Sequence, residues 1–439
     1  MQVFDKSSVF LLNNITYKDM NKTTKSVALV GMASLMMACS STKKTDGNVV
    51  VTRPAPGMEM DYAFAQPADN DMVAKNNTFA WNLFKQVQGM DNKVVSPISV
   101  TYLMGMLANG ADGITQQEIL STIGWKGASV ADVNAFCKAM MENAEKADPA
   151  TVVNIANYIA VNKNESLKAP FVSAVENNFA AGVEKLDFSS PKALAAINGW
   201  CKKHTDGMIP QIIDQVEPSA LSYLLNAIYF NGAWTDKFNK DRTKLENFRG
   251  FTRNIQKVQM MHRNGNHYYG FNDVCAALRL PYGNGSYRMT ILLPNEGKSI
   301  DDVLKEMTPQ RLQAMTQQMA ERKVDVKLPR FTIETELGLN DIVAKLGAPS
   351  MFNPGKANFS KLADGAFFVT KMLQKAKIEV GEEGTKAAAV TAAVVMRAMA
   401  AGDEPEPVNF HCDRPFLYLI TDSHTGAILF MGQFTGNNE

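Results

Sequence analysis

The stretch from Glu379 to Met399 constrains the fold of this chain most. It combines small side chains with a long run that has neither glycine nor proline, the residues that interrupt strands and helices. It reads EVGEEGTKAAAVTAAVVMRAM, with no glycine or proline after Gly384. Side chains of a strand alternate between two faces. On that spacing one face is uniformly small and the other carries a lysine: Thr385, Ala387, Ala389, Thr391 and Ala393 against Lys386, Ala388, Val390, Ala392 and Val394. A strand that enters a packed sheet needs this pattern, because a tight core excludes large side chains.

The same run is compatible with a helix, since alanine is the best helix former. Its flanks favour the strand. The tip Met396–Met399 follows, then the polar segment AGDEPEP, and then an apolar block from Pro415 to Phe434. An insertable segment, an exposed tip and a return into the core together predict a bait loop over about 379–408.

Composition indicates a soluble globular protein without a nucleic-acid partner. Of 439 residues, 46% are hydrophobic and 20% charged, which is ordinary for a globular domain. The formal net charge is +1, and no long block of lysine and arginine suits nucleic acid. No linker is visible after about residue 72, so 72–439 is predicted to be a single domain.

The amino end predicts export. Within residues 1–38, the run Val27–Ala38 is too short to span a bilayer and suits the core of a signal peptide. It ends in a sequence that resembles a bacterial lipobox, with Cys39 as the lipidated residue; a plain secretory signal is the alternative. Residues 1–19 precede a second candidate start at Met20. The polar residues 39–71 are predicted to be a flexible tether.

These features predict an exported lipoprotein of the bacterial envelope, on the periplasmic or the surface face of the outer membrane, or a secreted protein. Contact with the membrane would be through the lipid anchor only. A single acyl chain binds a membrane weakly, so firm anchoring needs several chains.

No catalytic motif and no metal-binding motif is present. GxSxG, HExxH and GxGxxG are missing, and Gly297-Lys298-Ser299 resembles a phosphate loop but has Leu292 where the first glycine must stand. The five histidines and the remaining cysteines show no ligand spacing. We therefore expect no enzyme activity, no catalytic residue, no metal and no cofactor, and free, mostly buried thiols at Cys137, Cys201, Cys275 and Cys412.

Periodicity predicts helices early and strands late in the chain, as in an α+β protein with a largely antiparallel sheet. Expected helices cover 72–87, the stretch from Ser96-Pro97 to Gly110–Gly113, 170–183 and 192–205, and Thr115–Glu118 has capping-box spacing. Expected strands cover 152–161, 221–230, 275–281, 287–293, 324–333 (interrupted by Pro329) and 428–434.

Taken together and in order, several blocks resemble the serpin family of serine protease inhibitors over about residues 73–435. The blocks are Asn92–Thr115 (with Ser96, Pro97, Ser99 and Gly110), Asn226–Trp234 followed by Phe238, Thr243 and Phe248, Leu280–Tyr282, Leu293–Pro294, Leu328–Phe331, Glu379–Thr391, Asp413–Phe416 and Leu429–Gly432.

The resemblance implies the serpin fold, which is α+β with three mainly antiparallel β-sheets, about nine helices and an exposed reactive loop. It implies suicide inhibition of serine endopeptidases, with cysteine endopeptidases as a further target class, by a monomer that holds its target as a covalent acyl complex. The target cuts the loop and forms an acyl-enzyme, and the freed loop then inserts as a new strand. The implied hinge residues are Glu382, Glu383, Gly384, Thr385, Ala387, Ala388, Ala389 and Thr391.

Two bonds are candidates for the cleaved bond. The family's usual spacing from Glu382 gives Ala398–Met399, which suits elastase-like or subtilisin-like proteases. Chemistry favours Arg397–Ala398, because Arg397 is the only trypsin-type anchor on the tip. The segment up to Pro415 is longer than is usual in the family, so both bonds stay open and Arg397 is preferred.

Three positions depart from the family pattern. Lys386 stands where glutamate is usual and Val390 where alanine is usual, and both fall on the face expected to meet solvent. Gln374 stands where a histidine is common; it keeps a donor and an acceptor but does not titrate. The small hinge favours an inhibitor over the alternatives, which are a non-inhibitory serpin acting as a carrier or chaperone and an unrelated surface-binding or solute-binding lipoprotein.

Overall fold

The computed structural model describes residues 67–87, 89–385 and 406–436. The predicted signal segment, Cys39, the tether up to residue 66 and the loop residues 386–405 lie outside these ranges. What the sequence predicts for them therefore stays a prediction.

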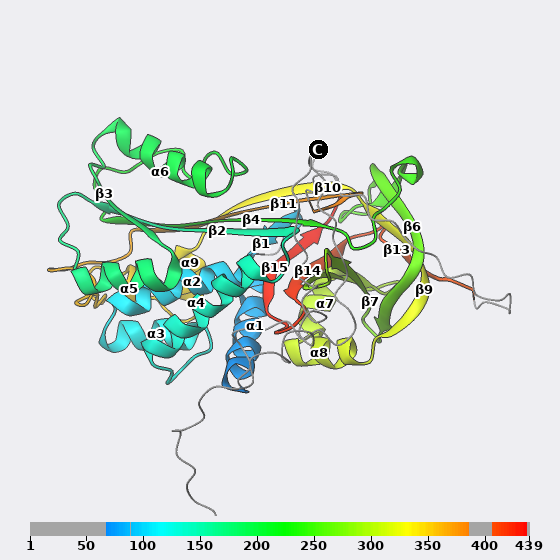
Figure 1. Cartoon of the computed structure of the whole chain (residues 1–439), viewed down its shortest axis with the longest axis horizontal. Coiled ribbons are helices and arrows are strands. Elements are labelled where there is room, and N and C mark those ends of the chain that lie inside the picture. The colour runs from blue at the N-terminus through cyan, green and yellow to red at the C-terminus, as the bar shows by residue number, and fades with distance from the viewer. Residues whose placement is uncertain (1–66, 88, 386–405, 437–439) are drawn as a thin grey trace, which may run out of the picture. The chain divides into compact units, whose positions relative to one another are not determined.

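Nine α-helices lie within the described residues, and none of them is long and apolar enough to cross a membrane. They are α1 Pro67–Val87, α2 Pro97–Gly110, α3 Gly113–Thr122, α4 Val130–Lys146, α5 Ala169–Phe179, α6 Pro191–His204, α7 Ile300–Glu306, α8 Pro309–Gln317 and α9 Asn340–Leu346, with 3-10 turns η1 Lys240–Arg242 and η2 Ser350–Phe352. Figure 1 shows α6 on one face of the long strands β2 and β4, and α2 and α4 on the other.

Six strands form a sheet in the order β10-β11-β12-β4-β2-β3. Their bounds are β2 Thr151–Asn162, β3 Gly182–Leu186, β4 Ser222–Ala233, β10 Phe331–Gly338, β11 Lys371–Gly381 and β12 Gly384–Thr385. Over Lys371–Lys377, where β12 does not reach, the strands β11 and β4 pair directly with each other in parallel. The two-residue β12 lies between their ends and pairs with both.

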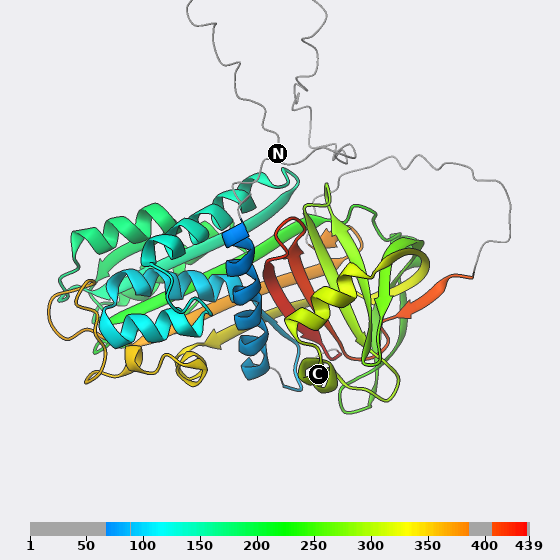
Figure 2. The same cartoon turned by 90° about the horizontal axis from the view of Figure 1, so that it is seen from below.

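Nine strands form the second hydrogen-bonded sheet, in the order β1-β15-β14-β8-β7-β6-β9-β13, with β5 beside β6. Their bounds are β1 Lys93–Val95, β5 Lys244–Arg249, β6 Ile255–Phe271, β7 Cys275–Tyr282, β8 Tyr287–Pro294, β9 Ala320–Pro329, β13 Val408–His411, β14 Phe416–Asp422 and β15 Ile428–Phe434. In Figure 2, β14 and β15 lie beside α1, between the helical region and β6.

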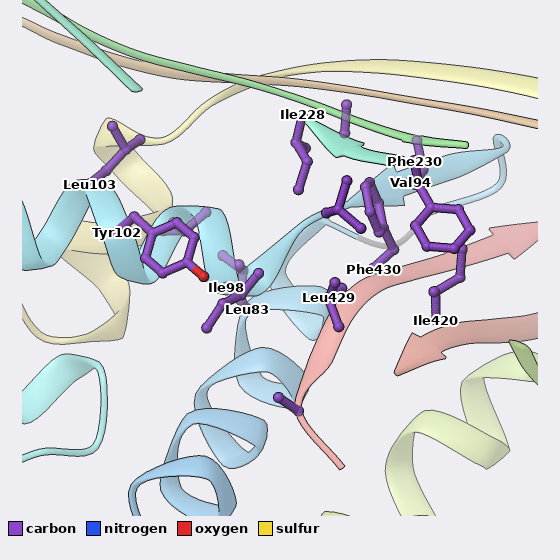
Figure 3. Close-up of a cluster of buried hydrophobic side chains, with 14 of the residues drawn as sticks. Leu83, Val94, Ile98, Tyr102, Leu103, Ile228, Phe230, Ile420, Leu429 and Phe430 are labelled. Carbon is purple, nitrogen blue, oxygen red and sulfur yellow. The ribbon is translucent and has the colours of Figure 1, made fainter. Parts of the chain in front are cut away.

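The core fills the space between the two sheets and the helices next to them. Figure 3 shows Phe230 of β4 facing Phe430 of β15, with ring centroids 6.1 Å apart, and both side chains are buried. The side chains that complete this cluster come from β1 and from the amino-terminal helices: Val94, Leu83, Ile98, Tyr102 and Leu103.

The α+β class, the mainly antiparallel pairing and the expected number of helices are confirmed. Within the described residues only three pairings are parallel, namely β11 with β4, β9 with β13 and β2 with β3. The three expected sheets form two hydrogen-bonded networks, because β6 is 17 residues long and pairs with β5, β7 and β9.

Three local expectations change. Helix α1 begins at Pro67, so Pro67–Asp71 is helical rather than part of the tether. Thr115 caps no helix, because its hydroxyl contacts Ser350 Oγ at 3.0 Å and accepts from the backbone N–H of Asn358. The helix predicted over 170–183 ends at Phe179, where Ala180 takes a left-handed conformation with φ 47° before β3.

Candidate functional site

The described part of the predicted hinge lies where β11 and β4 diverge. From Lys371 to Lys377, β11 pairs in parallel with β4. The chain then turns through Glu382 and Glu383 and comes back as β12, antiparallel to both strands. Thr385 lies opposite Val380 of β11 and Gly232 of β4. The first two residues after the turn are therefore already part of the sheet.

Gly384 fits this place because it has no side chain. Its φ is +145°, a region that other residues rarely adopt. A Cβ atom built there would overlap the carbonyl oxygen of Gly232 and crowd the backbone of Ala233. Any larger residue would push β12 away from β4.

Thr385 points into the core, which is the orientation that the period-two pattern predicts. It is 0% exposed, and its Oγ1 lies 2.7 Å from the hydroxyl of Tyr282. Tyr282 stacks on Trp234 with ring centroids 4.3 Å apart. Burial raises the pKa of the Tyr282 phenol, so the hydroxyl remains protonated and can donate to Thr385. The hinge role of Thr385 stays a prediction.

The segment that follows Trp234 holds the turn. The backbone N–H of Trp234 donates to the Glu383 carbonyl, and the N–H of Phe238 donates to the Glu382 carbonyl, both at 2.9 Å. The indole N–H of Trp234 donates to the carbonyl of Gly381 at 2.8 Å. Since these bonds reach three consecutive residues, they fix the direction in which the chain re-enters the sheet.

Two glutamates of the turn have different partners. Glu382 is 7% exposed and accepts from the hydroxyl of Thr243 at 2.8 Å, with Arg330 Nη1 3.8 Å away. Glu383 pairs with Lys237 at 2.5 Å and with Lys240 at 3.1 Å. The Lys237 ammonium, aided by Lys240, holds the pKa of the Glu383 carboxyl below its usual range.

An open pocket of about 490 Å³ lies beside the turn. It is lined by the end of β11, the start of β10 and the turn, including Arg330, Phe331, Glu379, Val380 and Glu382. Positive and negative side chains are mixed in its wall, so the pocket does not select one sign of charge.

Gln374 ties β11 to the start of α2. Its side chain is 1% exposed, accepts from the N–H of Ser96 at 3.0 Å and donates to the carbonyl of Ser96 at 2.8 Å. The expected use of both donor and acceptor is confirmed. On the adjacent strand, Asn226 Oδ1 is buried and accepts no hydrogen bond from the described residues.

The structure brings the described hinge residues Glu382, Glu383, Gly384 and Thr385 together at one end of the six-stranded sheet. The other predicted residues lie outside the described part: Ala387, Ala388, Ala389, Thr391, Arg397, Ala398, Met399 and Cys39. The supporting residues Tyr282, Trp234, Lys237 and Arg330 had no assigned role in the sequence analysis, although all of them except Lys237 stand inside the blocks that carry the family resemblance.

Within the described residues, no group of three or more histidine, cysteine or acidic side chains could hold a metal ion. The four cysteines 137, 201, 275 and 412 are free and buried. Burial raises the pKa of the Cys201 and Cys275 thiols to about 12, which keeps both unreactive.

Comparisons with known proteins agree with this geometry. A model of the family "Serpin (serine protease inhibitor)" matches residues 74–436. Iripin-2 of Ixodes ricinus is 33% identical over 372 residues, which cover 82% of this chain and 92% of that protein. The leukocyte elastase inhibitor of Homo sapiens is 31% identical over 380 residues, which cover 83% and 99%.

A solved structure supports the same assignment. The native state of tengpin, a thermophilic serpin, superimposes with a TM-score of 0.78 at 27% identity and covers 89% of this chain and all of that one. With a family model that spans most of the sequence and relatives that align almost end to end, the chain belongs to the serpin family of serine protease inhibitors.

Proposed function

We propose that this protein is a covalent, loop-inserting inhibitor of serine endopeptidases, with cysteine endopeptidases as a second target class. The observation that carries the proposal is β12, in which Gly384 and Thr385 already pair with both β11 and β4. Insertion would replace one parallel pairing, between β11 and β4, by two antiparallel ones. Antiparallel pairing is slightly more stable per residue, so the exchange is favourable once the strands separate.

The register of β12 predicts where the following residues would pair. Each step forward in the loop is one step back along β11 and β4, so Thr391 would arrive opposite Gln374 and Asn226. A threonine hydroxyl is a donor, and Asn226 Oδ1 is a buried acceptor without a partner among the described residues. Insertion would therefore satisfy a group that is unsatisfied in the present arrangement.

The chemistry of the trap belongs to the protease. Its serine oxygen attacks the carbonyl carbon of Arg397, an ester forms, and the amine of Ala398 leaves with the carboxy-terminal part. Water would then hydrolyse the ester unless insertion is faster. Small residues on the inward face, from Thr385 onward, allow the strand to enter without overpacking the core.

The test is incubation with trypsin and with elastase, followed by a denaturing gel and mass determination of the products. We expect a stable complex whose mass equals the protease plus the chain up to Arg397. An Arg397→Ala variant should no longer trap trypsin, while still trapping elastase through Ala398–Met399. Cleavage without any complex would reject the inhibitor and favour a carrier or chaperone.

We also propose that the protein is an envelope lipoprotein acylated on Cys39, on either face of the outer membrane, and that it works as a monomer. The support is the apolar run Val27–Ala38 directly before Cys39 and the polar stretch that follows. Labelled palmitate should be incorporated by the wild type and not by Cys39→Ser. Equal labelling of both would reject the acylation site, and a soluble unlabelled product would indicate plain secretion.

A further inference from the structure

A partly buried arginine contacts the segment that holds the hinge turn. Arg263 of β6 donates through Nη1 to the carbonyl oxygen of Asp236, and its guanidinium carbon is 5.1 Å from the centre of the Phe238 ring. A cation over an aromatic ring is attracted by the ring's electrons. Arg263 therefore contacts both ends of the segment Asp236–Phe238.

His267 also contacts Arg263. The two residues are four apart on β6, so their side chains lie on the same face of the strand. His267 is 4% exposed, and Arg263 Nη2 lies 3.0 Å from Nε2 and 3.2 Å from Nδ1 of its ring. The guanidinium can only donate, so the imidazole must be neutral and accept. Burial and the Arg263 charge lower the pKa of His267 to about 3, which keeps the ring neutral.

Charged residues lie next to this pair on neighbouring elements. Asp236 is the acidic residue that favours the charged form of Arg263, and Arg322 of β9 stands opposite His267 in the strand pairing. Desolvation lowers the pKa of Arg263 to about 10, so it is still a cation at neutral pH. Its Nε is buried without a hydrogen-bond partner among the described residues. A partly desolvated cation held by a carbonyl, a ring and an imidazole is costly, which argues for a positioning role.

A continuous set of contacts runs from this pair to the hinge. Phe238, under the guanidinium, donates its N–H to the carbonyl of Glu382 at 2.9 Å. Lys237, in the same segment, pairs with Glu383. The segment Asp236–Phe238 thus links Arg263 to the turn that precedes β12.

We infer that Arg263 and His267 form a positioning pair that fixes the segment Asp236–Phe238 and, through it, the turn that aims β12 between β11 and β4. The inference rests on the proposed inhibitory function for its consequence, which is the speed of insertion after cleavage. Without the pair, the turn opens more often, β12 starts insertion later, and more of the inhibitor is hydrolysed as a substrate.

The first measurement needs no protease. Amide hydrogen exchange of Phe238 and Trp234, the donors to Glu382 and Glu383, is followed in the uncleaved protein. Arg263→Met and His267→Phe should speed this exchange by tenfold or more. His267→Gln keeps an acceptor and should behave like the wild type. Arg279→Met is the matched control, because Arg279 is also a partly buried arginine with a pKa lowered to about 10, and it lies on β7.

The second measurement is the number of inhibitor molecules consumed for each protease trapped. We expect a severalfold rise for Arg263→Met and His267→Phe, and no change for His267→Gln or Arg279→Met. Variants are compared only after their melting curves show a folded protein. If Arg263→Met does not fold, the comparison of His267→Phe with His267→Gln tests the positioning role.

The outcomes separate the two proposals. A wild type that forms no complex overturns the inhibitory function, while the exchange data still test the pair. Exchange and trapping that stay unchanged in both Arg263→Met and His267→Phe overturn the positioning role, even though the inhibitor works. Equal damage from His267→Gln and His267→Phe also contradicts it, because the accepted hydrogen bond would then be irrelevant.

Discussion

Two strands near the middle of the molecule, β15 and β11, are built in opposite ways. Every residue of β15 is buried, and the strand lies between β1 and β14 with α1 and α2 packed against it. Residues of β11 alternate strictly between buried and half-buried, and one of its neighbours, β4, is paired in parallel. Separating β15 from its neighbours would expose both buried faces of that strand. Separating β11 from β4 would expose only the one buried face of β11.

The comparison indicates where the fold can change. Beside β11 the sheet has a two-residue strand already inserted at one end and a buried hydrogen-bonded side chain at Gln374. On β4, Asn226 Oδ1 has no hydrogen-bond partner among the described residues. None of these three features would stabilise a nine-stranded sheet that had opened beside β15. In the proposed mechanism, the six-stranded sheet is therefore the part that accepts another strand, and the nine-stranded sheet is the part that stays closed.

The largest effect should come from placing a charge inside each sheet. An unpaired ion in the core costs several kcal/mol. Met431→Arg in β15 should prevent folding, since Met431 is 0% exposed in a strand that cannot move. Thr385→Arg should fold, because β12 can leave the sheet, but it should be cut at the same bond and released without a complex. Circular dichroism and a denaturing gel distinguish these two results.

Lys386→Arg is the control for Thr385→Arg, since it keeps a charge on the opposite face and should still form the complex. A persistent complex with Thr385→Arg would show that the inward face has been assigned wrongly. A folded Met431→Arg would remove the contrast between the two strands.

An intermediate effect is expected at Gln374. Gln374→Met keeps the volume but leaves the buried N–H of Ser96 without its acceptor, which costs about 1–3 kcal/mol. Because this bond is present in the uncleaved protein, the uncleaved variant should melt a few degrees lower than the wild type. Gln313→Met on α8, at an exposed position, is the matched control. Equal melting temperatures for both variants would mean that Gln374 does not hold the sheet closed.

The smallest effect concerns the lysine that replaces the usual glutamate. In the register of β12, Lys386 would arrive opposite Glu379, on the outer face where Glu379 now pairs with Lys377 at 2.9 Å. A cross-strand pair of opposite charges contributes roughly 0.2–1 kcal/mol. Lys386→Glu should lower the melting temperature of the cleaved form slightly, and Glu379→Lys added to it should restore part of the loss.

The control for this charge reversal is the uncleaved protein, in which the double variant should show no such coupling. High salt should weaken the coupling in the cleaved form. Additive effects of the two substitutions after cleavage would mean that the register does not continue beyond Thr385.

Much of this arrangement follows from local pattern. The alternation after Gly384 predicted an inward Thr385, and Pro97 after Ser96 predicted the start of α2, because both signals depend on neighbouring residues only. The capping box at Thr115 failed because its hydroxyl has partners more than two hundred residues away, at Ser350 and Asn358. A local signal cannot show such a partner.

The support of the hinge was hidden for the same reason. Arg263 and His267 are four residues apart on a strand that the sequence analysis did not identify, and their importance comes from Asp236 and Phe238, which reach them only in the folded chain. The remainder of the loop, including Arg397, lies outside the described residues, and its role rests on the sequence and on the family alone. The structure therefore adds the positioning pair Arg263 and His267, while the choice of the cleaved bond remains a sequence prediction.

The most direct test of the central claim is the melting temperature before and after a single cut in the loop. If the residues after Thr385 continue the pairing of β12, about ten residues gain neighbours on both sides, and each cross-strand pair adds roughly 0.2–1 kcal/mol. The cut is made by limited proteolysis near Met396–Met399 and verified by mass. A marked rise in melting temperature is the predicted result. An unchanged or lower melting temperature would contradict insertion, because a cut that only frees the chain adds no stability.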